Sequence, residues 1–269
     1  MKLDDTIAAV VTGGASGLGL ATATALRACG VKVAIFDFNP DTGEKAAQSI
    51  GATFCRVDVM DDAMVDAGFA RAREANGQER VLVNCAGGLL PGNRGGGRTV
   101  ARSRRTGQII RHNADDFAGV IALNTVGTFR CITAAAAGMM TLEPLDEDGA
   151  RGAIVNTSSL AAQDGQIGQA SYSAAKAAIA GMTLTIARDL ADEGIRVNSI
   201  LPGIMGTPPL LGLRETAPAM WESLSNLAPF PRRMGKPDEF ADLVLCMLRN
   251  DFFNGQAVRL DGAARMPPR

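Results

Sequence analysis

Three residue types that often carry enzyme chemistry are almost missing: His, Tyr and Trp each occur once among the 269 residues. A single histidine, His112, argues against metal sites built from several imidazoles. It also leaves a Ser-His-Asp triad only one candidate base. A single tyrosine means that any tyrosine chemistry must take place at Tyr172. We therefore predict no metal site and direct attention to that residue.

An excess of charge is also missing, because the formal net charge is −1. Proteins that bind nucleic acids generally carry a strongly basic surface, so we predict no nucleic-acid partner. The first residues lack the basic and long apolar regions of a secretory signal. The longest stretch of small apolar residues, around Cys131–Leu142, is too short to cross a bilayer. We predict no membrane span.

Paired cysteines are absent as well. The number of cysteines is odd and none forms a C-x-x-C pair, which argues against a disulfide framework and a zinc knuckle. Scattered thiols fit a reducing compartment, so we expect a cytoplasmic protein. The five residues are Cys29, Cys55, Cys85, Cys131 and Cys246.

Apolar runs of strand length alternate with amphipathic stretches of helix length along most of the chain. Such runs indicate a parallel sheet covered on both faces, a doubly wound Rossmann-like α/β fold of about seven strands. We predict one domain over residues 1–269. The expected strands are Thr6–Val11, Val31–Phe36, Thr53–Val57, Val81–Cys85, Ala153–Thr157, Ile195–Ile200 and Ala257–Leu260. The expected helices are Ala21–Cys29, Asp41–Ser49, Ala63–Ala75, Asp115–Met140, Tyr172–Leu190 and Pro237–Arg249.

Two segments interrupt this alternation. Residues 88–114 are rich in Gly and Arg and have no clear period, which predicts an insertion or a mobile loop. Residues 204–233 contain many Pro and Met residues and predict a lid or substrate loop. No acidic residue occurs between Glu79 and Asp115, and residues 88–114 contain six arginines: Arg94, Arg98, Arg102, Arg104, Arg105 and Arg111.

A glycine-rich turn follows the first strand, with the spacing Gly13-x-x-x-Gly17-x-Gly19. Glycines permit a tight turn and a close backbone approach, and a helix N-terminus presents free N–H groups to a pyrophosphate. Such a turn can also serve only to connect strand and helix. Asp37 ends the second strand about 20 residues later, where an acid accepts the ribose hydroxyls of NAD and repels the extra phosphate of NADP. Taken together, the turn and Asp37 predict an NAD site.

Further strand ends lie at the same edge of the predicted sheet, where open α/β folds bind ligands. Asp58 and Val59 follow the third strand and could border the adenine. Asn84, Cys85, Ala86 and Gly87 close the fourth strand.

Tyr172 and Lys176 share one helix face, because residues four apart are neighbours on a helix. A free tyrosine is a poor base at pH 7, and lowering its pKa by about 3 units requires roughly 4 kcal/mol. An ammonium group and an oxidised nicotinamide both favour the phenolate. Ser159, at the end of the fifth strand, could hold the substrate oxygen. The alternative is a buried tyrosine with a surface lysine, and small flanking residues favour the proton-transfer pair.

These motifs, in this order, resemble those of the short-chain dehydrogenase/reductase family. The match includes the glycine turn from Thr12, the Asn84–Gly87 motif, Asn124, Ser159, Tyr172-x-x-x-Lys176 and Pro202-Gly203. Cys85 stands where the family usually has a second Asn. The stretches Thr12–Thr22, Gly181–Val197 and Leu260–Met266 resemble the type 2 3-hydroxyacyl-CoA dehydrogenase (17β-hydroxysteroid dehydrogenase type 10-like) branch.

The resemblance implies a role for each matching position. Tyr172 would be the general acid/base, Lys176 would hold the nicotinamide ribose and lower the tyrosine pKa, and Ser159 would bind the substrate oxygen. Asn124 would kink its helix and hold a water in a proton relay. The residues implied to line the cofactor are Gly13, Ser16, Gly17, Leu18, Gly19, Asp37, Asp58, Val59, Cys85, Ala86, Gly87, Tyr172, Lys176, Pro202, Gly203, Met205 and Thr207.

The resemblance also implies an NAD-dependent homotetramer that oxidises 3-hydroxyacyl-CoA substrates. Its helices at Val120–Met140 and Ala174–Leu190 would form the interface. A hydroxysteroid or other secondary-alcohol dehydrogenase and a 3-oxoacyl carrier-protein reductase stay open, as does a non-catalytic nucleotide sensor. The arginine-rich segment is either a solvated loop or a site for coenzyme A phosphates, which guanidinium groups suit.

Overall fold

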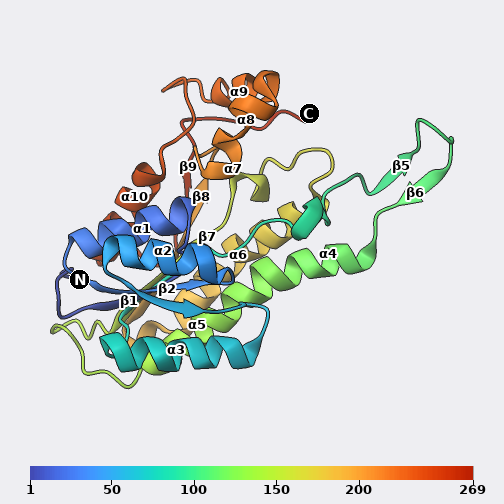
Figure 1. Ribbon diagram of the computed structural model, residues 1–269. Coiled ribbons are helices and arrows are strands. Elements are labelled where there is room, and N and C mark those ends of the chain that lie inside the picture. The colour runs from blue at the N-terminus through green and yellow to red at the C-terminus, as the bar shows by residue number, and fades with distance from the viewer. Residues whose placement is uncertain (269) are drawn as a thin grey trace.

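A seven-stranded parallel sheet forms the centre of the protein, as the computed structural model shows for residues 1–268 (Figure 1). Its strand order is β3-β2-β1-β4-β7-β8-β9. The predicted doubly wound α/β fold is confirmed. The strands are β1 (Ala8–Thr12), β2 (Lys32–Asp37), β3 (Thr53–Arg56), β4 (Val81–Asn84), β7 (Gly152–Thr157), β8 (Ile195–Pro202) and β9 (Ala257–Leu260).

Helices cover both faces of the sheet, which is why its central strands are mostly apolar: every residue of β1 is buried. On one face lie α1 (Gly17–Ala28), α2 (Pro40–Ile50) and α10 (Pro237–Arg249). On the other lie α3 (Asp62–Asn76), α4 (Ala114–Ile121), α5 (Gly127–Met139) and α6 (Ala170–Asp189). Figure 1 shows α1 and α2 above the strands and α3 and α5 below them.

Local sequence signals fix several helix ends. The side chain of Asn39 accepts the N–H groups of Asp41 and Thr42 and so caps α2, which ends at Gly51 with a φ of 65°. The carboxylate of Asp61 caps α3 in the same way through Met64 N–H, at 3.0 Å. α1 begins at Gly17 rather than at the predicted Ala21, because the glycine turn itself forms the first turn of the helix.

The helix predicted over Asp115–Met140 is not regular. α4 and α5 are joined by a π-helical turn, Ala122–Val126, with Asn124 at its centre. The combined stretch Ala114–Met139 is, within residues 1–268, the one helix whose length and composition would allow it to cross a membrane. It is a core helix here, because Cys131, Ile132 and Met139 are buried against the sheet.

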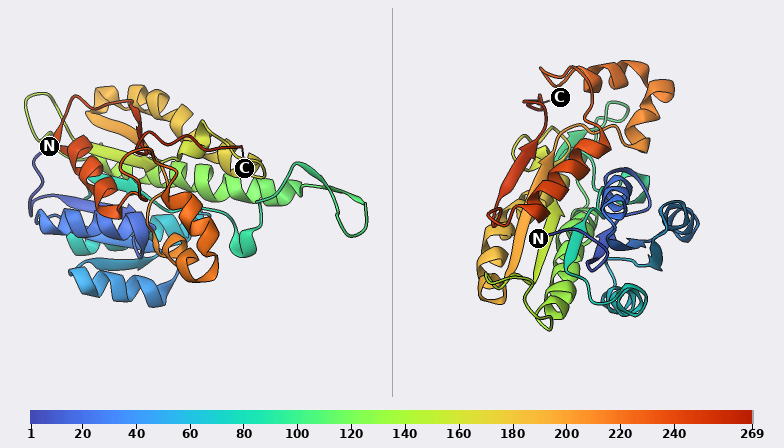
Figure 2. Two further views of the ribbon diagram at one scale, coloured as in Figure 1. Left: turned by 90° about the horizontal axis from the view of Figure 1, so that it is seen from above. Right: turned by 90° about the vertical axis from the view of Figure 1, so that its left-hand side faces the viewer.

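The arginine-rich segment contains regular structure that the sequence did not reveal. β5 (Val100–Arg102) and β6 (Ile109–Arg111) form an antiparallel hairpin. Strands of three residues are too short to show a period, so the prediction of an insertion or a mobile loop did not locate this hairpin. Figures 1 and 2 show the hairpin projecting from the body beyond the N-terminal end of α4.

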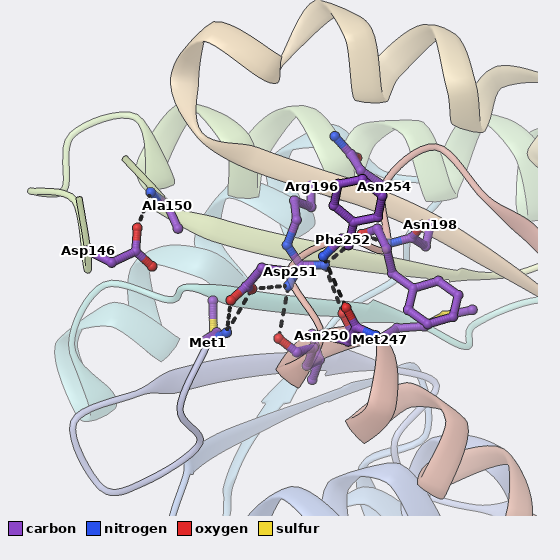
Figure 3. A network of polar contacts seen from close by, with 12 residues as sticks. Met1, Asp146, Ala150, Arg196, Asn198, Met247, Asn250, Asp251, Phe252 and Asn254 are labelled. Carbon is purple, nitrogen blue, oxygen red and sulfur yellow. Dashed lines mark hydrogen bonds and ion pairs between the residues drawn. The ribbon is translucent and has the colours of Figure 1, made fainter. Parts of the chain in front are cut away.

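The segment after β8 folds into three short helices, α7 (Pro208–Leu211), α8 (Leu213–Thr216) and α9 (Pro218–Ser225). At the opposite end of β8, Arg196 fastens the strand to the end of α10 (Figure 3). Its guanidinium donates to the carbonyls of Met247 and Phe253 at 2.8 and 2.7 Å, and to Asp251 at 3.0 Å. The Met1 ammonium contacts the same Asp251 carboxylate. These contacts hold the last strands in place beneath the site described next.

Candidate active site

A cleft of about 510 Å³ opens at the carboxyl edge of the sheet, where the strand order reverses between β1 and β4. Ligands bind at this switch point in open α/β folds. All predicted cofactor residues line the cleft. They are Gly13, Ser16, Gly17, Leu18, Gly19, Asp37, Asp58, Val59, Cys85, Ala86, Gly87, Tyr172, Lys176, Pro202, Gly203, Met205 and Thr207, together with Ser159.

Each glycine of the turn stands where a side chain would collide. Gly13 has a φ of +63°, and a Cβ there would lie 2.7 Å from the backbone nitrogen of Ala86. A Cβ at Gly19 would overlap the carbonyl of Gly13 itself. At Gly17, a Cβ would lie 3.2 Å from the Thr207 methyl group. The unusual spacing of the turn therefore follows from close packing of the turn on itself, on the backbone that follows β4 and on the Thr207 side chain.

The N-terminus of α1 faces the cleft without a side-chain cap, because Ser16 makes no capping hydrogen bond. The first N–H groups of a helix have no partner inside the helix, so they are available to a phosphate. The Asp37 carboxylate stands at the end of β2 and accepts Ala15 N–H at 3.1 Å and Asn39 N–H at 3.1 Å. Free N–H groups, a glycine cradle and a strand-end carboxylate together fit a dinucleotide.

Cys85, which departs from the family motif, lines the cleft as a thiol. Its sulfur accepts a hydrogen bond from the Thr157 hydroxyl at 3.4 Å. Burial raises the pKa of Cys85 to about 11, against the opposing effects of Thr157 and Lys176. At neutral pH the group is neutral, so it acts as a small wall residue rather than as a nucleophile.

Lys176 is buried beside Tyr172. Its side-chain nitrogen lies 5.7 Å from the centre of the tyrosine ring and donates to the Thr157 carbonyl at 3.0 Å. Only 4% of the residue is exposed, and burial lowers the pKa of Lys176 to about 8. A Cβ on Gly87 would lie 3.2 Å from the lysine nitrogen, so the glycine leaves room for the ammonium at the end of β4.

The phenol of Tyr172 behaves differently from the sequence prediction. Burial raises the pKa of Tyr172 above 10, and the hydrogen bond with Ser159 only partly opposes this. The prediction of a lowered pKa counted two positive charges, the Lys176 ammonium and an oxidised nicotinamide, but not the loss of water around the ring. In the absence of a cationic ligand, the structure therefore holds a protonated phenol.

The two serines that follow β7, Ser158 and Ser159, make different hydrogen bonds. The Ser158 hydroxyl is buried and donates to the Lys176 carbonyl at 2.7 Å, so it ties β7 to α6. The Ser159 hydroxyl accepts Ala161 N–H at 3.1 Å and contacts Tyr172. Ser159 is thus the serine whose hydroxyl reaches the Tyr172 phenol.

Asn124 does not line the cleft. Its amide donates to the carbonyls of Gly88 and Val120 at 2.8 and 2.9 Å, and its oxygen accepts Gly88 N–H at 2.9 Å. These bonds hold the chain leaving β4 against the π-helical turn, which agrees with the expected kink. Both amide protons are used, so only the amide oxygen has capacity left for the expected water.

Several lining residues were missed by the sequence analysis. Phe38 follows Asp37, is 61% exposed, and lies against the Arg56 guanidinium. Its place directly after the strand-end acid was the available signal. The other missed residues are Phe36, Val57, Leu123, Thr157, Ser158, Pro208, Pro209 and Leu210.

The six arginines of the insertion lie outside the cleft lining. Arg94 pairs with Asp116 on α4 at 3.5 Å. Arg102 and Arg111 lie on the projecting hairpin, and Arg104 and Arg105 lie in its turn. The cleft is therefore built without them.

Comparisons with known proteins agree with this geometry. Residues 7–217 match the family model for short chain dehydrogenases. A 3-hydroxyacyl-CoA dehydrogenase type-2 from Drosophila melanogaster is 44% identical over 261 residues, which cover 96% of this chain and 97% of the relative. The Homo sapiens protein of the same name is 44% identical over 267 residues, 97% of this chain and 96% of the relative. A crystal structure of 3-hydroxyacyl-CoA dehydrogenase type-2 from Mycobacterium avium superimposes with a TM-score of 0.89, at 37% identity and full coverage of both chains.

Proposed function

The chain belongs to the short-chain dehydrogenase family, and we propose that this oxidoreductase uses NAD to interconvert 3-hydroxyacyl-CoA and 3-oxoacyl-CoA. The convergence of Tyr172, Lys176 and Ser159 on one cleft with the glycine turn carries the proposal. No other tyrosine exists in the sequence to serve as the acid/base.

Ser159, Tyr172 and Lys176 have different proposed roles in the oxidation of the alcohol. Bound NAD supplies the hydride acceptor for the carbinol carbon. Ser159 holds the substrate hydroxyl, and the Tyr172 phenolate takes its proton. Lys176 would hold the cofactor ribose, and its ammonium would stabilise the Tyr172 phenolate, which burial alone disfavours.

Asp37 supports NAD over NADP. Its carboxylate lines the cleft at the end of β2, where it would accept the ribose hydroxyls of NAD, and the extra phosphate of NADP would meet a negative charge there. This disfavours the alternative of a 3-oxoacyl carrier-protein reductase that uses NADPH. A hydroxysteroid or other secondary alcohol remains the second candidate substrate.

An apolar cavity supports a substrate with a hydrophobic part. It has a volume of about 350 Å³ and adjoins the cofactor cleft at Gly203 and Met205. Leu224, Leu227 and Ala228 from the segment around α9 form one wall. This agrees with the prediction that residues 204–233 shape substrate choice.

We further propose a homotetramer whose interface includes α4, α5 and α6. Large apolar side chains on these helices remain exposed: Phe117 at 37%, Phe129 at 47% and Leu184 at 45%. Large exposed apolar side chains of this kind are typical of surfaces that a partner subunit covers. Ala177 and Gly181 of α6 are also exposed and permit close helix packing.

The proposed compartment is the cytoplasm. All five cysteines are free thiols, as expected for a reducing environment.

The substrate is tested by comparing kcat/KM for 3-hydroxyacyl-CoA esters of increasing chain length with that for hydroxysteroids, each with NAD and with NADP. We expect the acyl-CoA esters and NAD to give the highest values. A preference for steroids or for NADP would overturn the corresponding part of the proposal. A lack of turnover with every alcohol would favour a non-catalytic nucleotide sensor.

A further inference from the structure

The projecting hairpin has a mixed apolar and basic face. Its register pairs Val100 with Arg111 and Arg102 with Ile109, and these four side chains share one face because positions alternate along a strand. Val100 is 53% exposed and Ile109 is 55% exposed. A two-stranded hairpin with uncovered apolar side chains is marginally stable in water. Contact with another protein surface would therefore stabilise this face of the hairpin.

The hairpin charges are not compensated within the chain. Among residues 1–268, Arg102, Arg104, Arg105 and Arg111 form no ion pair. All four are exposed. Arg102 donates to the carbonyl of Gly107 in the hairpin's own turn, at 2.9 Å. The hairpin thus presents a compact positive charge that no carboxylate of the described chain neutralises by an ion pair.

A complementary surface lies at the other end of the same helical stretch. After α5, the acidic turn (residues 143–148) places four exposed carboxylates together: Glu143, Asp146, Glu147 and Asp148. None of them forms an ion pair in the described chain. Arg80 and Arg151 lie beneath the turn, but their guanidinium groups donate to backbone carbonyls. Asp146 accepts only Ala150 N–H of the same turn (Figure 3).

The acidic turn also carries apolar side chains. Leu145 is 40% exposed and Met140, at the end of α5, is 44% exposed. The acidic turn therefore complements the hairpin in charge and in apolar surface. The turn offers carboxylates around apolar side chains, and the hairpin offers guanidinium groups around apolar side chains.

We propose that the hairpin of one protomer docks on the acidic turn of a second copy of this chain. The geometry follows from the proposed oligomer, on which this inference rests. A two-fold axis through the middle of the stretch Ala114–Met139 sets the two copies antiparallel. The stretch has 26 residues, about 39 Å of helix, with the hairpin beyond one end and the acidic turn beyond the other.

The two-fold operation exchanges these ends. It brings each hairpin to the partner's acidic turn, so one dimer contains the contact twice. Figure 2 shows the hairpin continuing outward past the end of α4, the direction that this contact requires.

The root of the hairpin is held firmly, so the hairpin is a directed arm rather than a free loop. The Ser171 hydroxyl donates to the Gly95 carbonyl, and Gly97 N–H donates to the Gly168 carbonyl at 2.8 Å. His112 N–H donates to the Thr99 carbonyl at 2.9 Å and closes the base. A fixed root reduces the entropy that docking costs.

Cysteine crosslinking tests the contact directly. In a Cys246→Ser background, a chain carrying Arg104→Cys and Glu147→Cys cannot join these positions within itself, because they lie at opposite ends of the helical stretch. We expect mild oxidation to give a disulfide-linked dimer on a non-reducing gel. The matched control carries Arg104→Cys and Lys45→Cys, with Lys45 exposed on α2, and should stay monomeric on the gel. Equal crosslinking of both proteins, or of neither, overturns the proposal.

Charge reversal tests the energetics. We expect Arg102→Glu/Arg104→Glu/Arg105→Glu, or Asp146→Arg/Glu147→Arg/Asp148→Arg, to weaken association about tenfold at low salt. Combining both sets should restore association, and high salt should remove the differences. The control Lys32→Glu/Lys45→Glu/Arg71→Glu changes the net charge by the same amount as the hairpin variant, at other exposed positions, and should associate normally.

Two further outcomes would contradict the proposal. In one, the combined variant fails to recover. In the other, the hairpin variant associates normally but has a raised KM for acyl-CoA, which would assign the arginines to coenzyme A phosphates. A wild-type monomer would overturn both this contact and the proposed tetramer, while turnover measured at 340 nm tests the dehydrogenase function independently.

Discussion

Replacing Lys176 by methionine should stabilise the ligand-free fold near pH 7 while removing activity. Burial lowers the pKa of this lysine from 10.5 to about 8, a difference that corresponds to roughly 3 kcal/mol. The substitution also leaves the Thr157 carbonyl without its donor, which costs about 1 kcal/mol. We therefore expect the free energy of unfolding to rise by about 2 kcal/mol. Activity is lost because the ammonium no longer holds the ribose or supports the phenolate.

The effect of pH has a definite sign. Between pH 8 and 10.5 the unfolded chain keeps a proton that the folded lysine releases, so the stability of the parent protein rises with pH in this window. The penalty is fully present below about pH 8 and absent above 10.5. The methionine variant lacks this contribution, so its advantage should be greatest near neutral pH and shrink as the pH rises.

Urea denaturation of the parent protein and of Lys176→Met across this pH range measures the difference in their free energies of unfolding. The other titrating groups contribute equally to both proteins, so they cancel in this difference. The control Lys45→Met, at an exposed position, should show no such pH-dependent gain. A methionine variant that is no more stable near pH 7, or whose advantage persists unchanged above pH 10.5, would refute the reasoning.

Three other predictions concern the cofactor cleft. Tyr172 is the only tyrosine, so an ultraviolet titration reports on this side chain alone. We expect the pKa of Tyr172 to exceed 10 without ligand and to fall when NAD binds. A pKa that does not change on NAD binding would contradict the proposed stabilisation of the phenolate. Asp37→Ala should reduce the preference for NAD over NADP by at least about tenfold in kcat/KM, and an unchanged ratio would remove Asp37 from that role. Gly87→Ala should lower NADH affinity, measured by fluorescence, because its Cβ would lie 2.5 Å from the Asn124 amide oxygen; unchanged affinity would show that the cleft adapts.

Much of the fold was readable from the sequence because strand apolarity and helix caps are local. α10 and β9 have the predicted ends. The strand-end residues Asp37 and Cys85 lie in the same cleft, as expected, because the carboxyl ends of parallel strands lie at one edge of the sheet.

What the sequence could not reveal depends on contacts between distant segments. The π-helical turn arises because Asn124 bonds Gly88, 36 residues away, which no periodicity records. The hairpin strands are too short to show alternation. The raised pKa of Tyr172 results from burial that only the folded chain creates.

Turnover of a 3-hydroxyacyl-CoA by Tyr172→Phe, followed at 340 nm with NAD, tests whether Tyr172 is the acid/base of this enzyme. We expect kcat to fall about 100-fold or more, because the substitution removes the only phenol that can carry the proton. NADH affinity should change little, since the ring remains in place. Turnover within a few-fold of the parent protein, with cofactor affinity intact, would contradict the assignment of Tyr172 as the acid/base.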